Sequence, residues 1–575
     1  MSEKTKKLSI SFDGFGGIDH NLVHSQKTVA DDIVNFRITK DGSLQKRPGY
    51  RLLTDLGSEI RAFYSLPVDG KLMLFVLCEE RLFLIDPTTG ESEQIGSVTS
   101  YSGRANFFCY RGMLFLVDGI DIYKYSDEVF SRVVGYVPLI GVNWGPNIPG
   151  KVLESRNIIN NYARLTYVVP KLSTVFFHTK YPVKSVIAVY VNGSRIDESR
   201  YEINTRFTTI DILNLYEGDF VEVLLEYEPL LDPLKDRLLN SYSAALFGSS
   251  GYMGIFLCGG NGSHTVFPSV FIDPESLEGS HAAVPESDIV YFPEYSQFEV
   301  GDGICEIKAV VRHRDKILIF TESDVWMTSP EIISKEAIPA VSINATIGCA
   351  ADNGALPVRN DTVSIGSNSI WLWSGNADDR QSFSATSIST EINDELCVHG
   401  LSNCGIFFDQ LRDELWIHSK ADDIAWIYNL ENKTWYKYRG IHAEQMISLG
   451  SQVAFASNGK IFVIDEALSA DFPSYGISVP IESHYYSAIN DFGSDSLKNL
   501  ASLSMSADLN GEPLYVEFDC DNKQTYQFPI TAPDSELHSV INKRLFSGRF
   551  CCLSIKISSN SSGVQSIHRL KVNTR

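Results

Sequence analysis

The sequence predicts an all-β protein: a β-propeller of about six or seven blades, with an inserted β-sandwich and a C-terminal β-sandwich. Aromatic residues are abundant, with 26 Tyr and 32 Phe against 7 Met, which is typical of chains that pack pleated sheets rather than long helices. Apolar strands recur at a regular spacing along most of the chain. Hairpins with turn-forming residues at their tips separate these strands, as the edges of propeller blades require.

The recurrent unit is an apolar strand, a polar turn and a second strand. Its clearest copies begin at Lys71, Gly112, Gly251, Lys316, Thr362, Glu414 and Gln452. The spacing is 41 residues from Leu72 to Met113, and then 46, 51 and 38 residues along the series Leu318, Ser364, Leu415 and Val453. Four-stranded blades repeat at about 40 to 50 residues because each blade holds four short strands and their turns. The repeat therefore indicates a propeller.

Two stretches break this period and predict additional domains. Residues 139–240 carry their own alternating strands, with Asn192-Gly193 as a strong hairpin signal. After about residue 478 the strands alternate without blade hairpins. We therefore expect an N-terminal arm or hairpin segment (1–59), the first blades (60–138), an inserted sandwich (139–240), the remaining blades (241–477) and a C-terminal sandwich (478–575). The polar stretch 275–303 is expected to be a long surface loop.

Charge and cysteine content exclude several classes of function. The net charge is -22 with a pI near 5.0, so tight binding to nucleic acid would need a local Lys/Arg patch. The start of the chain shows no secretory leader, and no run of about 18 apolar residues occurs, which predicts cytoplasmic synthesis without a membrane span. The ten cysteines are scattered and predict reduced thiols rather than disulfides.

Motifs that resemble catalytic signatures lack the context that the chemistry requires. His313-Arg314-Asp315 and Asp491-Phe492-Gly493 imitate protein-kinase triplets, but the first precedes a strand and no Val-Ala-Ile-Lys strand follows the glycines at 14–17. The acidic pairs at 378–379 and 422–423 are adjacent residues, which would point to opposite faces of a strand. We therefore predict no catalytic residues and no enzymatic activity.

A possible zinc site is incomplete. Cys397, His399 and Cys404 supply three ligands within eight positions, but no further Cys or His pair completes a tetrahedral set. The more economical interpretation is an ordinary loop before a strand. The sequence thus predicts neither a metal nor a cofactor.

The most specific segment is residues 35–51, NFRITKDGSLQKRPGYR. It predicts a strand, a tight turn at Asp41-Gly42 and a second strand that ends in Arg47-Pro48-Gly49, where proline fixes φ and glycine permits a reversal. From the residues alone, this segment could be an ordinary hairpin.

The same segment resembles the N-terminal motif of tail nozzle proteins of short-tailed bacteriophages, of the packaged-DNA stabilisation and tail tubular types. Residues 346–349 (TIGC) and 363–375 (VSIGSNSIWLWSG) are similar to the middle of the propeller in that family. The segments DFGSDSLKN and SGRFCCLSIKIS are similar to its closing sandwich.

The resemblance implies a structural virion protein of the viral tail. Six copies would form a hexameric ring below the portal and adaptor proteins, retain the packaged genome and conduct it during DNA ejection. Other partners would be tail fibres or further tail proteins, while packaged DNA would pass through without specific binding. Localisation would be the virion tail, after assembly in the cytoplasm of the host bacterium.

Within the motif, Asn35, Arg37, Arg47, Pro48 and Gly49 are the residues expected to contact a ring neighbour or the adaptor. Two alternatives stay open from the sequence. One is a propeller enzyme that acts on glycans, which would need converging carboxylates in a central pocket. The other is a tail-hub or neck scaffold that binds other virion or host proteins.

Overall fold

The structure is a computed structural model, and it describes residues 8–21, 28–142, 151–171, 175–179, 181–204, 208–228, 233–247, 254–270, 290–301, 303–329, 340–375, 383–521, 523–531 and 539–575. The chain divides into two compact units, 1–94 together with 349–575, and 95–348. Strands dominate both units, and the two α-helices of the described residues, α1 (Pro233–Leu239) and α2 (Asn393–His399), have seven residues each. The predicted all-β class is confirmed.

The described residues contain seven four-stranded antiparallel meanders, the repeating unit of the predicted β-propeller. Five of them are separate sheets and two are parts of larger sheets. The unit 95–348 holds three of them. The first consists of β10 (Asn106–Tyr110), β11 (Met113–Val117), β12 (Ile122–Ser126) and β13 (Val129–Arg132), and the second of β23 (Ser243–Phe247), β24 (Gly254–Cys258), β25 (Thr265–Pro268) and β26 (Phe298–Glu299). The third consists of β27 (Ile307–His313), β28 (Lys316–Thr321), β29 (Val325–Thr328) and β30 (Ala340–Asn344).

The other meanders belong mainly to the unit formed by 1–94 and 349–575. They are β6 (Ile60–Val68), β7 (Lys71–Cys78), β8 (Arg81–Ile85) and β9 (Ser92–Ser97); β31 (Ala355–Val358), β32 (Asp361–Ile365), β33 (Ile370–Ser374) and β34 (Ser384–Ser387); β35 (Cys404–Asp409), β36 (Glu414–Ser419), β37 (Ile424–Asn429) and β38 (Thr434–Arg439); and β39 (Gln445–Leu449), β40 (Gln452–Ser457) and β41 (Lys460–Asp465) with β5 (Gly49–Asp55).

The apolar strands that repeat in the sequence are the second strands of these blades. Each of β7, β11, β24, β28, β32, β36 and β40 is flanked in its sheet by the first and third strands. All six residues of β36 are buried, and so are all five residues of β24. A strand covered on both faces has no solvent face to alternate with, which explains why these runs are continuously apolar.

The N-terminal segment differs from the predicted arm, because it is part of the body of the protein. β5 pairs antiparallel with β41, with Tyr50 opposite Ile464, and completes the β39–β41 blade. Leu53 is buried in the core that this blade shares with the β6–β9 blade. Residues 49–55 therefore supply a blade strand rather than a segment that precedes the first blade.

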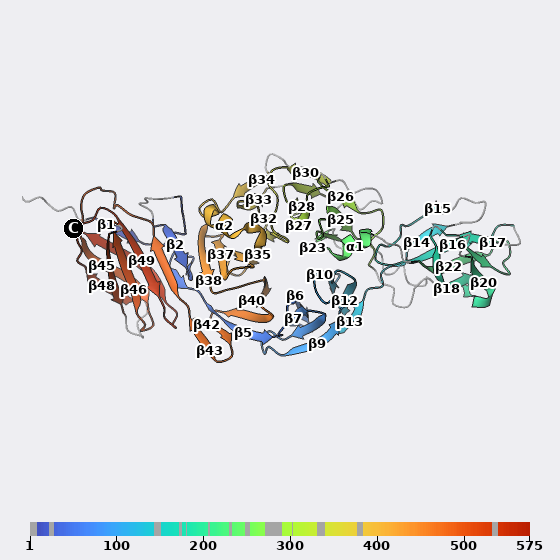
Figure 1. Cartoon of the computed structure of the whole chain (residues 1–575), viewed down its shortest axis with the longest axis horizontal. Helices are drawn as coiled ribbons and strands as arrows, with labels where there is room; N and C mark the ends of the chain where they lie inside the picture. The colour runs from blue at the N-terminus through green and yellow to red at the C-terminus, as the bar shows by residue number, and fades with distance from the viewer. Residues whose placement is uncertain are drawn as a thin grey trace, which may run out of the picture. The chain divides into compact units, whose positions relative to one another are not determined.

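The C-terminal sandwich also takes strands from the N-terminus, so it does not begin at residue 478 alone. One sheet contains β1 (Ser9–Phe12), β3 (Phe36–Ile38), β4 (Leu44–Lys46), β50 (Ser566–Thr574), β45 (Leu500–Asp508) and β48 (Ser539–Arg544). The other contains β2 (Ala30–Val34), β44 (Ser483–Ser487), β49 (Leu553–Ser559), β46 (Leu514–Cys520) and β47 (Gln524–Ile530), and a bridge from Val34 to Lys437 joins it to β38. In Figure 1, the blue strand β1 lies among the red C-terminal strands.

A hairpin extends the blade that β5 completes. It consists of β42 (Ala470–Ser474) and β43 (Ile477–Pro480), and β42 pairs with β5 through Phe472 and Arg51. The sequence pattern did not distinguish this hairpin from the blade strands before it.

The inserted domain has its own core. Its strands are β14 (Leu139–Val142), β15 (Lys151–Val152), β16 (Tyr162–Val168), β17 (Val175–His178), β18 (Val183–Val191), β19 (Ser194–Arg195), β20 (Tyr201–Asn204), β21 (Thr209–Ile212) and β22 (Phe220–Tyr227). They form a six-stranded and a three-stranded sheet, which lie within the predicted range 139–240. The α1 helix, in contrast, packs with the core of the neighbouring blades.

The stretch expected to be a surface loop at 275–303 is only partly described, because residues 271–289 lie outside the described residues. Its described end is not a surface loop. Val290, Phe292 and Val300 are buried, and Asn157 bridges Pro293. No helix in the described part of the chain combines the length and apolar character that a membrane crossing requires.

A neutral histidine is enclosed in the β35–β38 blade. His418 on β36 lies opposite Gly405 on β35, and a Cβ atom at Gly405 would come within 2.3 Å of the imidazole Nε2. The ring Nδ1 lies 2.7 Å from the Ala443 carbonyl oxygen, to which it donates. Burial lowers the pKa of His418 to about 4, since a charged imidazolium is disfavoured away from water.

Deletion of residues 1–55 is expected to abolish the cooperative unfolding transition of the chain. It removes one strand of a blade and β1–β4 of the sandwich, and leaves their apolar partners exposed. Circular dichroism during heating measures this. Within the full-length chain, Leu53→Ala should cost about 2–5 kcal/mol because it leaves a cavity, whereas the exposed neighbour substitution Asp55→Ala should cost much less. A truncated chain that melts cooperatively at the wild-type temperature would contradict this assignment.

Stability is expected to fall as the pH is lowered from about 6.5 to about 4, because the unfolded chain binds the His418 proton while the folded chain excludes it. Between pH 7 and pH 5 this residue accounts for about 2 kcal/mol of that loss. The variant His418→Asn retains a donor for Ala443 but does not titrate. Urea unfolding at both pH values should therefore show a smaller pH dependence in the variant, and an equal dependence would rule out this origin.

Candidate functional site at the N-terminal motif

The first half of the motif forms a hairpin that side chains hold closed. Ile38 pairs with Leu44 across a turn in which Gly42 has a φ of 79°. Asp41 accepts hydrogen bonds from the hydroxyl groups of Thr39, at 2.5 Å, and Ser43, at 2.8 Å. The Asp-Gly signal thus predicted the position of the turn.

After the hairpin the chain crosses from the sandwich to the propeller blade. β4 pairs with β50 of the sandwich, and β5, three residues later, pairs with β41 of the blade. At Gly49 a Cβ atom would lie 1.9 Å from the Ala470 carbonyl oxygen. Only glycine fits this contact, so the Arg47-Pro48-Gly49 sequence marks the crossing point.

The Arg47 side chain is 1% exposed at this crossing, and all five of its N–H donors have acceptors. Two of them form a bidentate pair with the Asp471 carboxylate, at 2.8 and 2.6 Å. The others bind Asn35 Oδ1 at 2.9 Å, the Pro48 carbonyl at 3.0 Å and the Arg439 carbonyl at 3.1 Å. The guanidinium therefore joins the motif to β38 and β42.

Asn35 is the second centre of the network. Its backbone has a φ of 58°, which asparagine tolerates better than most residues. Its side-chain oxygen accepts from Arg47 Nε and from the Arg439 amide at 2.8 Å, while its amide nitrogen donates to the Glu482 carbonyl at 2.7 Å. Asn35 thereby connects the motif to Arg439 at the end of β38 and to Glu482, just before the sandwich strand β44.

Arg37 forms a separate ion pair closer to solvent. Its guanidinium binds Glu466 in bidentate form, at 3.0 and 2.8 Å, and also donates to Gln45. Glu466 accepts a further hydrogen bond from Arg412 at 2.9 Å. Burial opposes ionisation of Glu466, but the two guanidinium groups outweigh this effect and lower its pKa.

Sequence reasoning missed two members of this network. Asp471 stands far from the motif in the chain, and no local pattern marks it as the partner of Arg47. Lys46 is 3% exposed and donates to the Ser561 carbonyl. Burial lowers the pKa of Lys46 to about 8. The only signal for Lys46 in the sequence was its place in the second strand predicted for the motif.

The structure thus brings Asn35, Arg47, Pro48 and Gly49 together at the crossing, whereas Arg37 lies in a separate ion pair with Glu466. Asn35, Arg47, Pro48 and Gly49 are buried within the single chain, and Arg37 is half-buried. Their observed contacts are internal, between the sandwich and the blades of the same unit. The expectation that they contact a ring neighbour or an adaptor stays a prediction.

A second polar cluster lies where α2, β2 and β38 meet. The Lys437 ammonium is 2.9 Å from Asp32 and 2.8 Å from Glu395, and His484 is 2.8 Å from Asp32. Burial disfavours ionisation of Asp32, but the hydrogen bond with His484 and the charge of Lys437 outweigh it and lower its pKa to about 2. This cluster also ties the sandwich to a blade.

The other residues considered for chemistry have structural partners. Cys397 Sγ donates to Asn368, Cys404 Sγ donates to Gly400, and His399 is 3.1 Å from Asp422. The described residues contain no group of three or more His, Cys, Asp or Glu side chains placed to hold a metal ion. The acidic pair at 378–379 lies outside the described residues. His313 is buried on β27.

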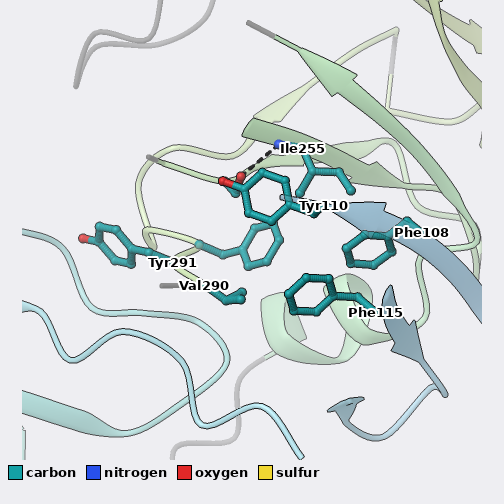
Figure 2. Close-up of a pocket in the computed structure, with 8 residues that line it drawn as sticks. Phe108, Tyr110, Phe115, Ile255, Val290 and Tyr291 are labelled. Atoms are coloured by element: carbon teal, nitrogen blue, oxygen red, sulfur yellow. Dashed lines mark hydrogen bonds between the residues drawn. The ribbon is translucent and has the colours of Figure 1, made fainter. Parts of the chain in front are cut away.

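Two hollows in the described residues are poor in polar groups. A groove of about 290 Å³ beside β5 is lined by Arg51, Leu52, Leu468, Phe472, Ser474, Tyr475 and Gly476. Figure 2 shows the other, a cavity of about 10 Å³ surrounded by the rings of Phe108, Tyr110 and Phe115. Ile255 and Ser269 also line it, and the Ile255 amide donates a hydrogen bond to the Ser269 hydroxyl at 2.9 Å. Neither hollow is lined by a carboxylate.

Neither a protein-family model nor a curated protein matches the chain. Solved structures with similarity include the AfRom2 CNH domain, at 7% identity and a TM-score of 0.35, over 72% of this chain and 99% of that one. BBS1N in complex with ARL6DN has 9% identity and a TM-score of 0.26, over 73% and 98%. A chain of the mitotic checkpoint complex has 7% identity and a TM-score of 0.30, over 71% and 95%. Likeness at this level carries no inference about function.

The variants Arg47→Ala and Asp471→Ala are each expected to lower the free energy of unfolding by about 3–5 kcal/mol, because each leaves the other charge buried without its partner. The double variant Arg47→Met/Asp471→Leu should regain part of the loss, since it leaves no unpaired charge. Urea unfolding measures all three. The control is Lys40→Ala, which breaks an exposed ion pair with Glu431 and should not shift the midpoint. Single variants as stable as this control would show that the network contributes little.

Proposed function

We propose that the chain is a structural virion protein, the tail nozzle of a short-tailed bacteriophage. In this role six copies form a ring at the distal end of the portal and adaptor. The ring retains the packaged genome and conducts it at ejection. The chain acts as an architectural part of the tail and catalyses no reaction.

The observation that supports the proposal is the motif at residues 35–51. Its resemblance to nozzle proteins is the most specific signal in the sequence, and the same residues form the internal junction between sandwich and blades. A conduit that holds a genome has to keep its parts in a fixed arrangement. The buried, fully hydrogen-bonded Arg47 suits that requirement. Separating the sandwich from the blades would break its pair with Asp471 and leave two unpaired charges in the interior.

The overall charge also supports a conduit rather than a protein that binds DNA tightly or with sequence specificity. With a net charge of -22 per chain, six copies would carry 6 × -22 = -132. Most surfaces of such a ring repel phosphate, so packaged DNA would move past them without specific binding. Contacts to portal, adaptor and tail-fibre proteins would supply the specificity of assembly.

Negative-stain microscopy of the purified protein, alone and with its neighbouring virion proteins, tests the proposal. We expect rings that add to the distal end of portal and adaptor assemblies. Particles made without the chain should package DNA but fail to retain it, and Lys40→Ala, which changes only an exposed ion pair, should restore retention.

The enzyme alternative is tested on the same preparation with a panel of glycans. Turnover of a glycan that a single Asp or Glu substitution abolishes would overturn the structural role. A protein that stays monomeric and absent from virions would overturn the nozzle assignment as well.

A further inference from the structure

The outer face of one sandwich sheet has an unusual composition. We give the name serine-basic face to eleven outward positions of β1, β50, β45 and β48, namely Ser9, Ser11, Arg569, Lys571, Asn573, Ser502, Ser504, Ser506, Val540, Asn542 and Arg544. Asp508, Ser566 and His568 border it on β45 and β50, and Asp508 lies 2.9 Å from His568. The alternate residues of the central strands, such as Leu503 and Val572, are buried in the core. The sheet therefore has an apolar inner face, and the eleven outward positions of the serine-basic face are Ser, Asn, Lys and Arg with one valine.

The strand register places these residues in rows across four strands. Ser9, Asn573, Ser502 and Arg544 form one row, and Ser11, Lys571, Ser504 and Asn542 form the next. A shorter third row contains Arg569, Ser506 and Val540. Neighbouring strands are about 4.8 Å apart and alternate residues about 6.7 Å apart along a strand, so the rows form a regular array of polar groups.

The charge of this face opposes the charge of the chain. It carries three cations, Arg544, Lys571 and Arg569, while the whole chain has a net charge of -22. Arg569 pairs with Asp13 at 2.5 Å, and both side chains are more than half exposed, so water and salt weaken the pair. Neither Arg544 nor Lys571 has a carboxylate partner among the described residues. Asp13 and Asp508 stand at its edge, so the three cations exceed the neighbouring carboxylates by one, and the face is mildly basic on an acidic protein.

Hydrogen bonds within the array leave donors available. The Ser504 hydroxyl donates to Asn542 Oδ1 at 2.6 Å, and Asn573 Nδ2 donates to the Ser502 hydroxyl at 3.0 Å. The Asn542 amide group donates no hydrogen bond within the described part of the chain, and its side chain is exposed. An external acceptor could therefore bind both this amide and the cations beside it.

The chemistry of the array selects the partner. Lys, Arg, Ser and Asn side chains are the groups that contact phosphate oxygens in complexes with DNA. None of the eleven positions is aromatic, so single-stranded bases have no ring on which to stack. A duplex would be held through its backbone and without regard to sequence.

We propose that the serine-basic face binds the phosphodiester backbone of double-stranded DNA, weakly and independently of sequence. The inference depends on the register and charge of this face alone, and it holds whether or not the chain is a tail nozzle. A weak contact of this kind is compatible with DNA that passes without specific binding.

Fluorescence anisotropy of a labelled 30-base-pair duplex with the full-length protein tests the proposal. With three phosphate contacts, the logarithm of the affinity should fall against the logarithm of salt concentration with a slope of about -2.7, so that affinity drops about 40-fold between 50 and 200 mM salt. The triple variant Arg544→Ser/Lys571→Ser/Arg569→Ser should lose this binding. Scrambling the duplex sequence should change nothing.

A control variant separates the face from the overall charge. Lys40→Ser/Lys184→Ser/Arg359→Ser removes three exposed cations elsewhere and changes the net charge by the same amount. It should retain DNA binding, as should the conservative variant Arg544→Lys/Lys571→Arg/Arg569→Lys. Melting temperatures establish that each variant is folded.

Three results would overturn the proposal. They are equal affinities of the two triple serine variants, preferential binding of a single-stranded oligonucleotide, and binding of anionic phospholipid vesicles in place of duplex DNA. The nozzle proposal does not share this readout, since ring formation with portal and adaptor is scored separately by microscopy. Loss of DNA binding with intact rings, and the reverse, are therefore distinguishable.

Discussion

A buried guanidinium group, that of Arg47, joins the C-terminal sandwich to neighbouring propeller blades within one compact unit. Desolvation of Arg47 and Asp471 is costly, and only the bidentate geometry together with three further acceptors offsets it. Every element that supplies an acceptor is therefore constrained: Asn35 in its left-handed conformation, the Pro48 carbonyl at the crossing and the end of β38 at Arg439. The sandwich could not shift relative to these blades without leaving donors of the guanidinium unpaired in the interior.

The same constraint explains the local sequence around the crossing. Glycine is required at position 49 because the backbone of Ala470 lies against it, and asparagine at position 35 meets both a backbone and a side-chain requirement. The motif that resembles a family signature is thus also the set of residues that this junction needs. The sequence pattern marks this segment as special but does not show what it pairs with. An N-terminal arm or hairpin was therefore predicted, whereas its strands belong to the sandwich and to a blade.

Blade strands were predictable because burial on both faces makes their signal local. The runs at Lys71, Lys316 and Gln452 are continuously apolar in the sequence and are second strands in the structure. Pairing between distant segments was not predictable, since neither β5 nor its partner β41 carries a mark of the other. The serine-basic face has the same character: Ser502, Ser504 and Ser506 look like an ordinary edge of polar alternation until the register aligns them with Lys571 and Arg544.

The completion of a blade by β5 has a consequence for biosynthesis. Ribosomes add roughly 5–20 residues per second, and β41 follows β5 by about 400 residues, so β5 emerges on the order of 20–80 seconds before its partner. During that interval β5 has exposed backbone donors and acceptors along both edges, a state that invites association with other nascent chains. The first strands of the chain are therefore among the last to pair, because their partners, such as β41 for β5 and β50 for β1, lie in the C-terminal third.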